Sequence, residues 1–285
     1  MNDKKILVVT DSSASLPAEL QAELDIRVIP LWLIWDDQCF RDGVDIDPHT
    51  FYQRLKDSKT LPSSTQPSAV EFKDYFQKLA GECDGIVSVL ASSRISGTVD
   101  SAESAREMIT VPVRVVDSLF SAMGQGLIAA AAARAAAAGN SIDEVTRVAE
   151  MTRDATNLLF VVDTLEYLHK GGRIGGAKRL MGTALNIKPI LHFYEGTIQP
   201  LSQTRTKKKG IQEMLNITAE RLGSSLMAEA AVVHVDCLEE GQSLVEEVKN
   251  RFNPPLIHLS DVSPVVGTHV GPGALGLAFY PEAKK

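Results

Sequence analysis

A glycine-rich stretch near the end of the chain, residues 265–276, carries the side chains best suited to chemistry. It reads Val-Val-Gly-Thr-His-Val-Gly-Pro-Gly-Ala-Leu-Gly, so Thr268 and His269 lie among four glycines and a proline. Because glycine adopts positive φ without steric cost and proline fixes φ, this composition predicts a rigid loop between two apolar strands. The imidazole either contacts a ligand or is a structural hydrogen-bonding residue. Either role needs a partner from an earlier segment.

Three clusters of hydroxyl side chains follow expected strands or precede expected helices. In an open α/β sheet the ligand lies beyond the carboxyl ends of the strands, and a helix N-terminus there favours an anion. Helix capping, the role that we assign to Ser68, would also explain any one cluster, but three together favour a shared anion site. The clusters are Asp11-Ser12-Ser13, Ser63-Ser64-Thr65, and Ser92-Ser93 with Ser96 and Thr98.

Two basic segments offer further contacts to an anion. Arg173 lies in Lys-Gly-Gly-Arg-Ile-Gly-Gly, residues 170–176, where the first glycine pair ends one expected helix and another helix follows. Its planar guanidinium suits a carboxylate or a phosphate. Arg205 belongs to a short basic run, residues 204–209. This run is either a solvated helix start or a surface that docks a phosphorylated ligand or an acidic partner.

Familiar catalytic and cofactor motifs are absent from the sequence. It contains neither a G-x-S-x-G elbow nor a phosphate-binding G-x-x-x-x-G-K-[ST] loop. Residues 271–276 spell G-x-G-x-x-G, but a dinucleotide site needs a following helix and an acidic residue about 20 positions further on. Only nine residues follow Gly276. The histidines and cysteines show no metal-ligand spacing, so we expect no metal and no cofactor.

Composition and charge narrow the class of protein. The 285 residues carry a formal charge of −7 and are 44% hydrophobic and 23% charged, as in an ordinary globular protein. A nucleic-acid-binding protein would normally be basic, so we expect no nucleic-acid partner. Three distant cysteines argue against a disulfide framework and favour the cytoplasm. The N-terminal apolar run, residues 6–10, is too short for a signal peptide, and the longest apolar run, residues 127–138, is too short to span a membrane. We therefore expect no stable membrane anchor.

The order of expected elements predicts an α/β protein of two domains. Over residues 1–157 short apolar strands alternate with helices, which predicts a three-layer α/β/α domain with a parallel sheet. In this part we expect a helix capped by Ser15 and one strand over residues 26–35. Over residues 158–285 we expect a helix near residues 176–185 and a hairpin around residues 194–196. These elements predict a smaller two-layer α/β domain with a mixed sheet.

Seven motifs, in order along nearly the whole chain, resemble those of the DegV family of bacterial fatty-acid-binding proteins. The resemblance implies a two-domain fold that holds a long-chain fatty acid between the domains. It also implies, as for some members, a non-catalytic subunit that presents the acid to a fatty-acid kinase subunit for phosphorylation to an acyl phosphate. The motifs are Val9-Thr-Asp-Ser-Ser13, Ser64-Thr-Gln-Pro-Ser68, Ser92-Ser-x-x-Ser-Gly-Thr98, Val116-Asp-Ser118, Lys170-Gly-Gly-Arg-Ile174, Asn186-Ile-Lys-Pro-Ile190 and Gly267-Thr-His-x-Gly-Pro-Gly-Ala274.

The resemblance also implies which residues bind the carboxylate. In the family these are a hydroxyl of the T-S-Q-P-S loop, a serine of the S-S-x-x-S-G-T loop and the histidine of the last motif. This sequence has Ser-Thr where the family commonly has Thr-Ser, so either hydroxyl of the first pair remains a candidate. The carry-over adds the arginine of K-G-G-R, an arginine near a kinase-facing surface, and the threonine beside the histidine as possible contacts. The candidates are Ser64 or Thr65, Ser93 or Ser96, and His269, with Arg173, Arg205 and Thr268 as the possible contacts.

Two other functions stay open at this point. One is a hydrolase that uses Ser93 and His269, although no acidic residue to orient the histidine and no oxyanion hole can be identified. The other is a kinase subunit that binds a small ketone through His269. The fatty-acid hypothesis requires a long apolar tunnel, because each buried methylene contributes roughly 0.8 kcal/mol.

Overall fold

The computed structural model describes residues 5–182 and 187–282, and its N-terminal half is built on a four-stranded parallel sheet. The strand order is β2-β1-β6-β7, and every pair is parallel. β1 and β6 are buried along their whole length, as their continuous apolar runs predict. The strands are β1 (Ile6–Asp11), β2 (Arg27–Ile29), β6 (Gly85–Leu90) and β7 (Val113–Asp117).

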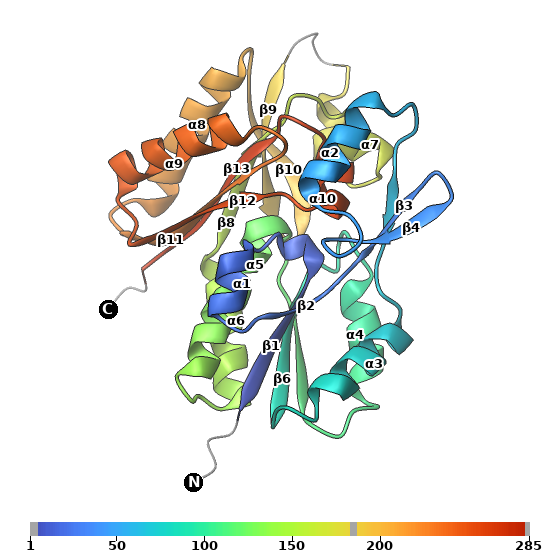
Figure 1. The fold of residues 1–285 in the computed structure, drawn as a ribbon. Helices are drawn as coiled ribbons and strands as arrows, with labels where there is room; N and C mark the ends of the chain where they lie inside the picture. The colour runs from blue at the N-terminus through green and yellow to red at the C-terminus, as the bar shows by residue number, and fades with distance from the viewer. Residues whose placement is uncertain (1–4, 183–186, 283–285) are drawn as a thin grey trace.

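Helices cover both faces of this sheet, so the expected three layers are confirmed (Figure 1). Phe72 and Phe76 of α3 pack with Leu90 on one face, while Val87 and Val89 join the cluster that contains the helices of the other face. The Ser68–Glu71 capping box that starts α3 is formed as expected. The helices are α3 (Ala69–Leu79) and α4 (Thr98–Arg106) on one face, and α5 (Ala122–Ala137) and α6 (Ile142–Ala155) on the other.

The C-terminal half is a six-stranded mixed sheet with the order β10-β9-β8-β13-β11-β12. Only β11 and β12 pair in parallel, and the expected hairpin is β9–β10. α8 (Lys207–Leu222) and α9 (Leu238–Phe252) cover the outer face. The domain boundary near residue 157 stays a prediction. The strands are β8 (Asn157–Val161), β9 (Lys188–Tyr194), β10 (Thr197–Thr204), β11 (Met227–His234), β12 (Leu256–Asp261) and β13 (Leu275–Pro281).

Helix α5 lies between the two sheets and is buried on nearly every side. It contacts β1 and β6 of the parallel sheet and β8, β11 and β13 of the mixed sheet. A helix enclosed in this way has almost no solvated face, which explains why its sequence is mostly alanine and glycine rather than an amphipathic pattern. Its N-terminus begins at the carboxyl edge of the parallel sheet, directly after β7.

Two expectations about the N-terminal half are wrong. Residues 26–35 do not form one strand, because Pro30 lacks the N–H that a continuous ladder needs. β2 ends before it, and the next strand belongs to a separate three-stranded sheet of order β4-β3-β5. Ser15 does not cap a helix but ends the 3₁₀ turn Ser12–Ala14 in the left-handed conformation. The other elements here are α1 (Ala18–Glu23), β3 (Trp32–Trp35), β4 (Gln38–Arg41), α2 (Pro48–Asp57) and β5 (Ser63–Thr65).

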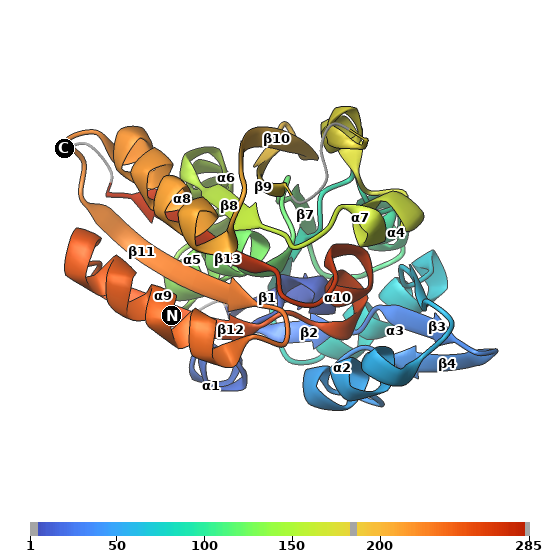
Figure 2. The same ribbon diagram turned by 90° about the horizontal axis from the view of Figure 1, so that it is seen from above.

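The glycine-rich stretch is also different from the expected strand, loop and strand. Its first part is a short helix, α10 (Pro264–Val270), with proline at the first position, and only the second strand, β13, forms. Figure 2 shows α10 beside α7 (Glu166–Lys170), which it contacts. The helix expected near residues 176–185 is a 3₁₀ helix over Gly175–Leu180. Residues 183–185 of that expectation, and Asn186 of the sixth motif, lie outside the described residues.

Candidate functional site

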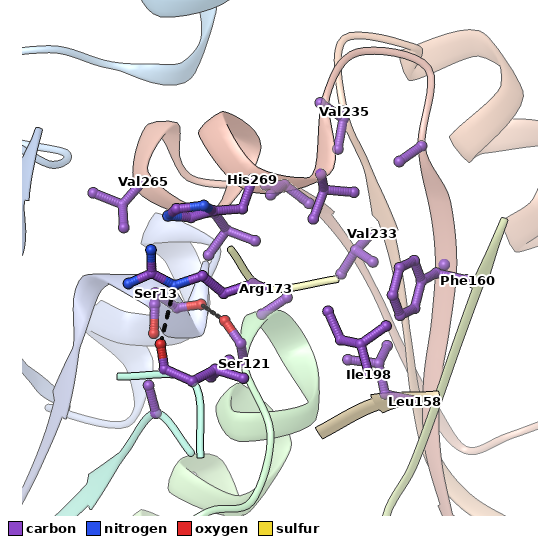
Figure 3. A pocket seen from close by; sticks show the side chains of 18 of the residues that line it. Ser13, Ser121, Leu158, Phe160, Arg173, Ile198, Val233, Val235, Val265 and His269 are labelled. Atoms are coloured by element: carbon purple, nitrogen blue, oxygen red, sulfur yellow. Dashed lines mark hydrogen bonds between the residues drawn. The ribbon is translucent and has the colours of Figure 1, made fainter. Parts of the chain in front are cut away.

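A cavity lies where the carboxyl edge of the parallel sheet meets the inner face of the mixed sheet. Of its 24 lining residues, 18 are apolar or glycine and come from both halves. In Figure 3 His269 and Arg173 lie on one side of the cavity, and Leu158, Phe160 and Val233 on the other. The cavity is therefore apolar with a restricted polar region. The polar lining residues are Ser13, Ser64, Ser96, Ser121, Arg173 and His269.

Ser64 and His269 meet in this cavity although they are far apart in the sequence. The Ser64 Oγ lies 2.7 Å from His269 Nε2. Ser64 faces inward because it is the middle residue of β5, whose side chains alternate between faces. The same alternation leaves Ser63 and Thr65 exposed, and Thr65 is not among the lining residues. Of the two candidate hydroxyls, the structure brings only Ser64 to the histidine.

Gly171 determines where the ring of His269 sits. A Cβ atom on Gly171 would lie 2.1 Å from His269 Nδ1, so only glycine leaves room for the imidazole. Nδ1 is buried and has no hydrogen-bond partner among the described residues. Burial, followed by the positive charge of Arg173, lowers the pKa of His269 to about 4. The ring is therefore neutral at physiological pH.

Arg173 lies in the cavity wall and is held by the backbone of two segments. Its Nε donates to the carbonyl oxygen of Ile95 at 3.2 Å, and its Nη1 donates to that of Gly171 at 2.7 Å. Burial lowers the pKa of the guanidinium. These bonds tie the K-G-G-R segment to the loop after β6, so a positive charge is fixed beside His269.

Ser96 and Ser93 point in different directions. Ser96 lines the cavity and shares a hydrogen bond of 2.7 Å with Thr98 Oγ1. Ser93 is exposed, and its hydroxyl donates to Asp117 at 2.5 Å, away from the cavity lining. Ser93 is thus bonded to the carboxylate at the end of the neighbouring strand β7, and of the two candidate serines only Ser96 lines the cavity.

The two remaining possible contacts do not reach the cavity. Thr268 is buried in α10, and its hydroxyl donates to the carbonyl of Pro264 at 2.9 Å, a bond that exists because this segment is a helix. Arg205 is exposed in the bend between β10 and α8, outside the lining.

Sequence reasoning missed the residues that position α10. The carboxyl of Asp42 is buried, and its Oδ1 accepts from the N–H of Val265 at 3.4 Å. Burial raises the pKa of Asp42 to about 7. The hydroxyl of Tyr52 donates to Val262, and a Cβ on Gly267 would lie 2.1 Å from it. Asp42 stands before a glycine, as in a solvated turn, so nothing in the sequence marks it as buried.

The described part of the chain, residues 5–182 and 187–282, shows neither of two features that would change the class of site. It contains no group of three or more His, Cys, Asp or Glu side chains placed to hold a metal ion. It also contains no helix both long and apolar enough to cross a membrane.

Known proteins resemble this chain over nearly its whole length. The family model "Uncharacterised protein, DegV family" matches residues 5–282. A DegV domain-containing protein of Listeria monocytogenes is 37% identical over 279 residues, which is 97% of this chain and 99% of that protein. Two solved structures have a similar fold. One, of a DegV family protein from Thermus thermophilus, concerns its fatty acid binding; it has a TM-score of 0.92 and 30% identity, over 97% of this chain and 99% of that one. The other is the structure of DegV, a fatty acid binding protein from Bacillus subtilis. It has a TM-score of 0.90 and 33% identity, over 98% of this chain and 100% of that one.

Proposed function

The chain belongs to the DegV family, and on that premise we propose that it binds a long-chain fatty acid in the cavity between its two sheets. The observation that carries the proposal is the cavity itself, in which 18 of the 24 described lining residues are apolar or glycine and six are polar. The two neighbours whose names mention fatty acid binding support the same ligand class.

The polar residues supply what a buried carboxylate requires. Burial of a carboxylate costs several kcal/mol unless hydrogen bonds or an opposite charge compensate it. Ser64, Ser96 and His269 provide neutral donors, and Arg173 provides a fixed positive charge. We assign the single ring proton of His269 to Nε2. This nitrogen then donates either to Ser64 or to the bound acid, while the buried Nδ1 is a bare acceptor.

The acyl chain occupies the apolar remainder of the cavity in this proposal. Because each buried methylene contributes roughly 0.8 kcal/mol, affinity increases with chain length until the cavity is full. The same apolar lining disfavours a small ketone, which would leave most of it without contacts. The cavity thus favours the long ligand over the short one.

The arrangement around His269 also disfavours a hydrolase. Ser93 bonds Asp117 rather than His269, so the pair that the hydrolase hypothesis needs is not among the described hydrogen bonds. Ser64 does contact His269, but a catalytic histidine needs a third group that orients it through Nδ1. Among the described residues Nδ1 has no partner, and it faces Gly171.

We further propose that the bound acid is presented to a fatty-acid kinase subunit, which phosphorylates its carboxylate. Hydroxyl groups both donate and accept, so the head site is compatible with an acid and with an acyl phosphate. The exposed position of Arg205, outside the cavity, is compatible with contact to such a partner. In this proposal the chain is a carrier, and the catalytic groups belong to the kinase.

Lipid extraction and native mass spectrometry of the purified protein test the binding proposal. We expect a co-purified fatty acid, or uptake of added palmitate, with weaker uptake by Ser64→Ala. Ser63→Ala is the matched control, because Ser63 is the exposed neighbour on the same strand. No binding of any fatty acid would refute the proposal.

Kinase presentation is tested by adding a fatty-acid kinase subunit and ATP and trapping acyl phosphate with hydroxylamine. Arg205→Ala should lower that yield but not palmitate uptake, and an unchanged yield would contradict the proposed contact.

A further inference from the structure

Ser121 has a side chain that its local structure does not use. It occupies the residue before α5, a 16-residue helix, where a serine normally accepts a hydrogen bond from a backbone N–H of the first turn. Here the side chain makes no capping bond. The residue is only 6% exposed and lines the cavity. A buried hydroxyl thus faces a mostly apolar space.

The hydrogen bond that Ser121 does make is poor. Its Oγ lies 3.4 Å from the carbonyl oxygen of Ser13, beyond the usual range of about 2.5–3.0 Å for two oxygens. The same carbonyl oxygen accepts from the hydroxyl of Ser15, again at 3.4 Å. Ser13 is 3% exposed, so this acceptor is buried as well. A weakly used donor and a weakly used acceptor therefore lie side by side in the cavity wall.

Such a pair matches a hydroxyl group on the ligand. A hydroxyl accepts one hydrogen bond and donates another, so it can accept from the Ser121 hydroxyl and donate to the Ser13 carbonyl oxygen. A methylene or a carbon–carbon double bond offers neither at comparable strength. The carboxylate does not compete for this position in the proposed function, since Ser64, Ser96, Arg173 and His269 hold it.

We propose that Ser121 and the Ser13 carbonyl form a second polar subsite that recognises a hydroxyl carried on the acyl chain. The preferred ligands are then hydroxylated long-chain fatty acids. This inference rests on the proposed function and deepens it, because it names the class of acid. In the view of Figure 3, Ser13 and Ser121 lie on the same side of the cavity as Arg173.

Competition binding with stearate and its hydroxylated forms tests the proposal. The panel holds stearate, oleate, and stearates hydroxylated next to the carboxylate, at mid-chain and close to the methyl end. We expect at least one hydroxystearate to bind about two- to tenfold more tightly than stearate, the effect of one net hydrogen bond. Oleate separates the effect of a bend in the chain from that of the hydroxyl.

Ser121→Ala should abolish this preference while stearate binds as before. Ser88→Ala is the matched control, because the Ser88 hydroxyl is also buried, has no hydrogen-bond partner among the described residues and does not line the cavity. If no hydroxystearate binds more tightly than stearate, or if the preference persists in Ser121→Ala, the subsite is wrong while the proposed function stands. If no acid in the panel binds, both fail.

Discussion

Two polar clusters connect the N-terminal half of the molecule to the C-terminal half, and they differ in how completely their buried groups are paired. In the first, which we call the Glu229 cluster, the carboxylate of Glu229 accepts two bonds from Arg134 and one each from His258 and Tyr280, all at 2.7–2.8 Å. In the second, the His269 cluster of Ser64, Arg173 and His269, one imidazole nitrogen is paired and the other is not.

The difference shows in the charge that each cluster carries. Burial alone would raise the pKa of Glu229, but bonds from His258, Arg134 and Tyr280 lower it to about 2, so the carboxylate is charged and compensated. His269 is neutral because burial and the nearby Arg173 disfavour its protonation. A fully paired cluster needs nothing more and holds the halves together. A partly paired one beside a cavity is suited to a ligand.

Removal of a partner from the Glu229 cluster should have the largest effect on stability. Arg134→Leu leaves a carboxylate that is 1% exposed without its main counter-charge. Loss of one member of a buried pair costs about 3 kcal/mol or more. We expect a drop of about 3 kcal/mol in the free energy of unfolding by urea, with little change in fatty-acid affinity per folded molecule. Arg147→Leu, which removes an exposed pair with Glu144, is the control and should leave stability nearly unchanged. Equal losses in the two variants would mean that burial of Glu229 is unimportant.

Removal of the imidazole should have the opposite effects, a large loss of fatty-acid affinity and little loss of stability. His269→Leu takes away a donor to the bound carboxylate, and a hydrogen bond to a charged group contributes roughly 1.5–3 kcal/mol. We expect palmitate affinity to fall about 10- to 100-fold in isothermal titration, while the unfolding midpoint of the empty protein hardly moves. The matched control is His192→Leu, which removes a partly buried neutral ring outside the cavity lining. If both variants bound palmitate like the unmodified protein, His269 would not hold the head group.

Much of this comparison could be anticipated from the sequence. The apolar strands and the alternation of elements predicted the parallel sheet, and the recurring hydroxyls predicted a shared anion site. The resemblance to the DegV family then implied that Ser64 or Thr65, Ser93 or Ser96, and His269 meet in one site. The choice between adjacent hydroxyls could not be made, because it depends on which face of β5 turns inward and on the carboxylate of Asp117 beside Ser93. Both features are set by tertiary packing, which sequence patterns do not show.

The helix α10 was beyond the reach of sequence patterns for a different reason. A run of valines and glycines argues for strand and loop by intrinsic preference. The helix forms because its backbone is held by Asp42 and packed on Tyr52, which lie more than 200 positions away. Its one glycine, Gly267, serves close approach, because a Cβ there would lie 2.1 Å from the Tyr52 hydroxyl oxygen. The sequence therefore identified His269 but not the residues that hold its helix in place.

Gly171→Ala tests whether the position of the imidazole matters as well as its presence. Gly171 has φ −76° and ψ −5°, which alanine adopts freely, so the severe conflict is the 2.1 Å approach of the new Cβ to His269 Nδ1; the Tyr167 carbonyl oxygen would be a tight contact at 3.1 Å. The ring must move, and we expect palmitate affinity to fall by about tenfold. Gly81→Ala, whose Cβ would meet nothing closer than 3.8 Å, is the control. A Gly171→Ala protein with full affinity would show that the ring tolerates displacement.

The smallest expected effect is a difference in pH dependence that separates the two clusters. The pKa of a histidine in the unfolded chain is about 6.5, and in the fold that of His269 is about 4. Between these values the unfolded chain binds a proton that the folded chain does not, so stability falls as pH drops through this window. For Glu229 the pKa falls from 4.5 to about 2 on folding, so its contribution is lost only at lower pH.

Urea unfolding of the empty protein over a pH series measures both windows. From about pH 6 to about pH 5, His269 should account for a loss of about 1 kcal/mol, which His269→Leu lacks. His192, whose pKa burial and Arg221 also lower to about 4, contributes a separate share, so the double variant should be flatter still. Below about pH 4 the single and double variants should fall in parallel, because Glu229 is unchanged in all of them. If His269→Leu kept the full slope above pH 5, the ring would already be protonated in the fold, and a charged imidazole would then meet the carboxylate instead of a neutral donor.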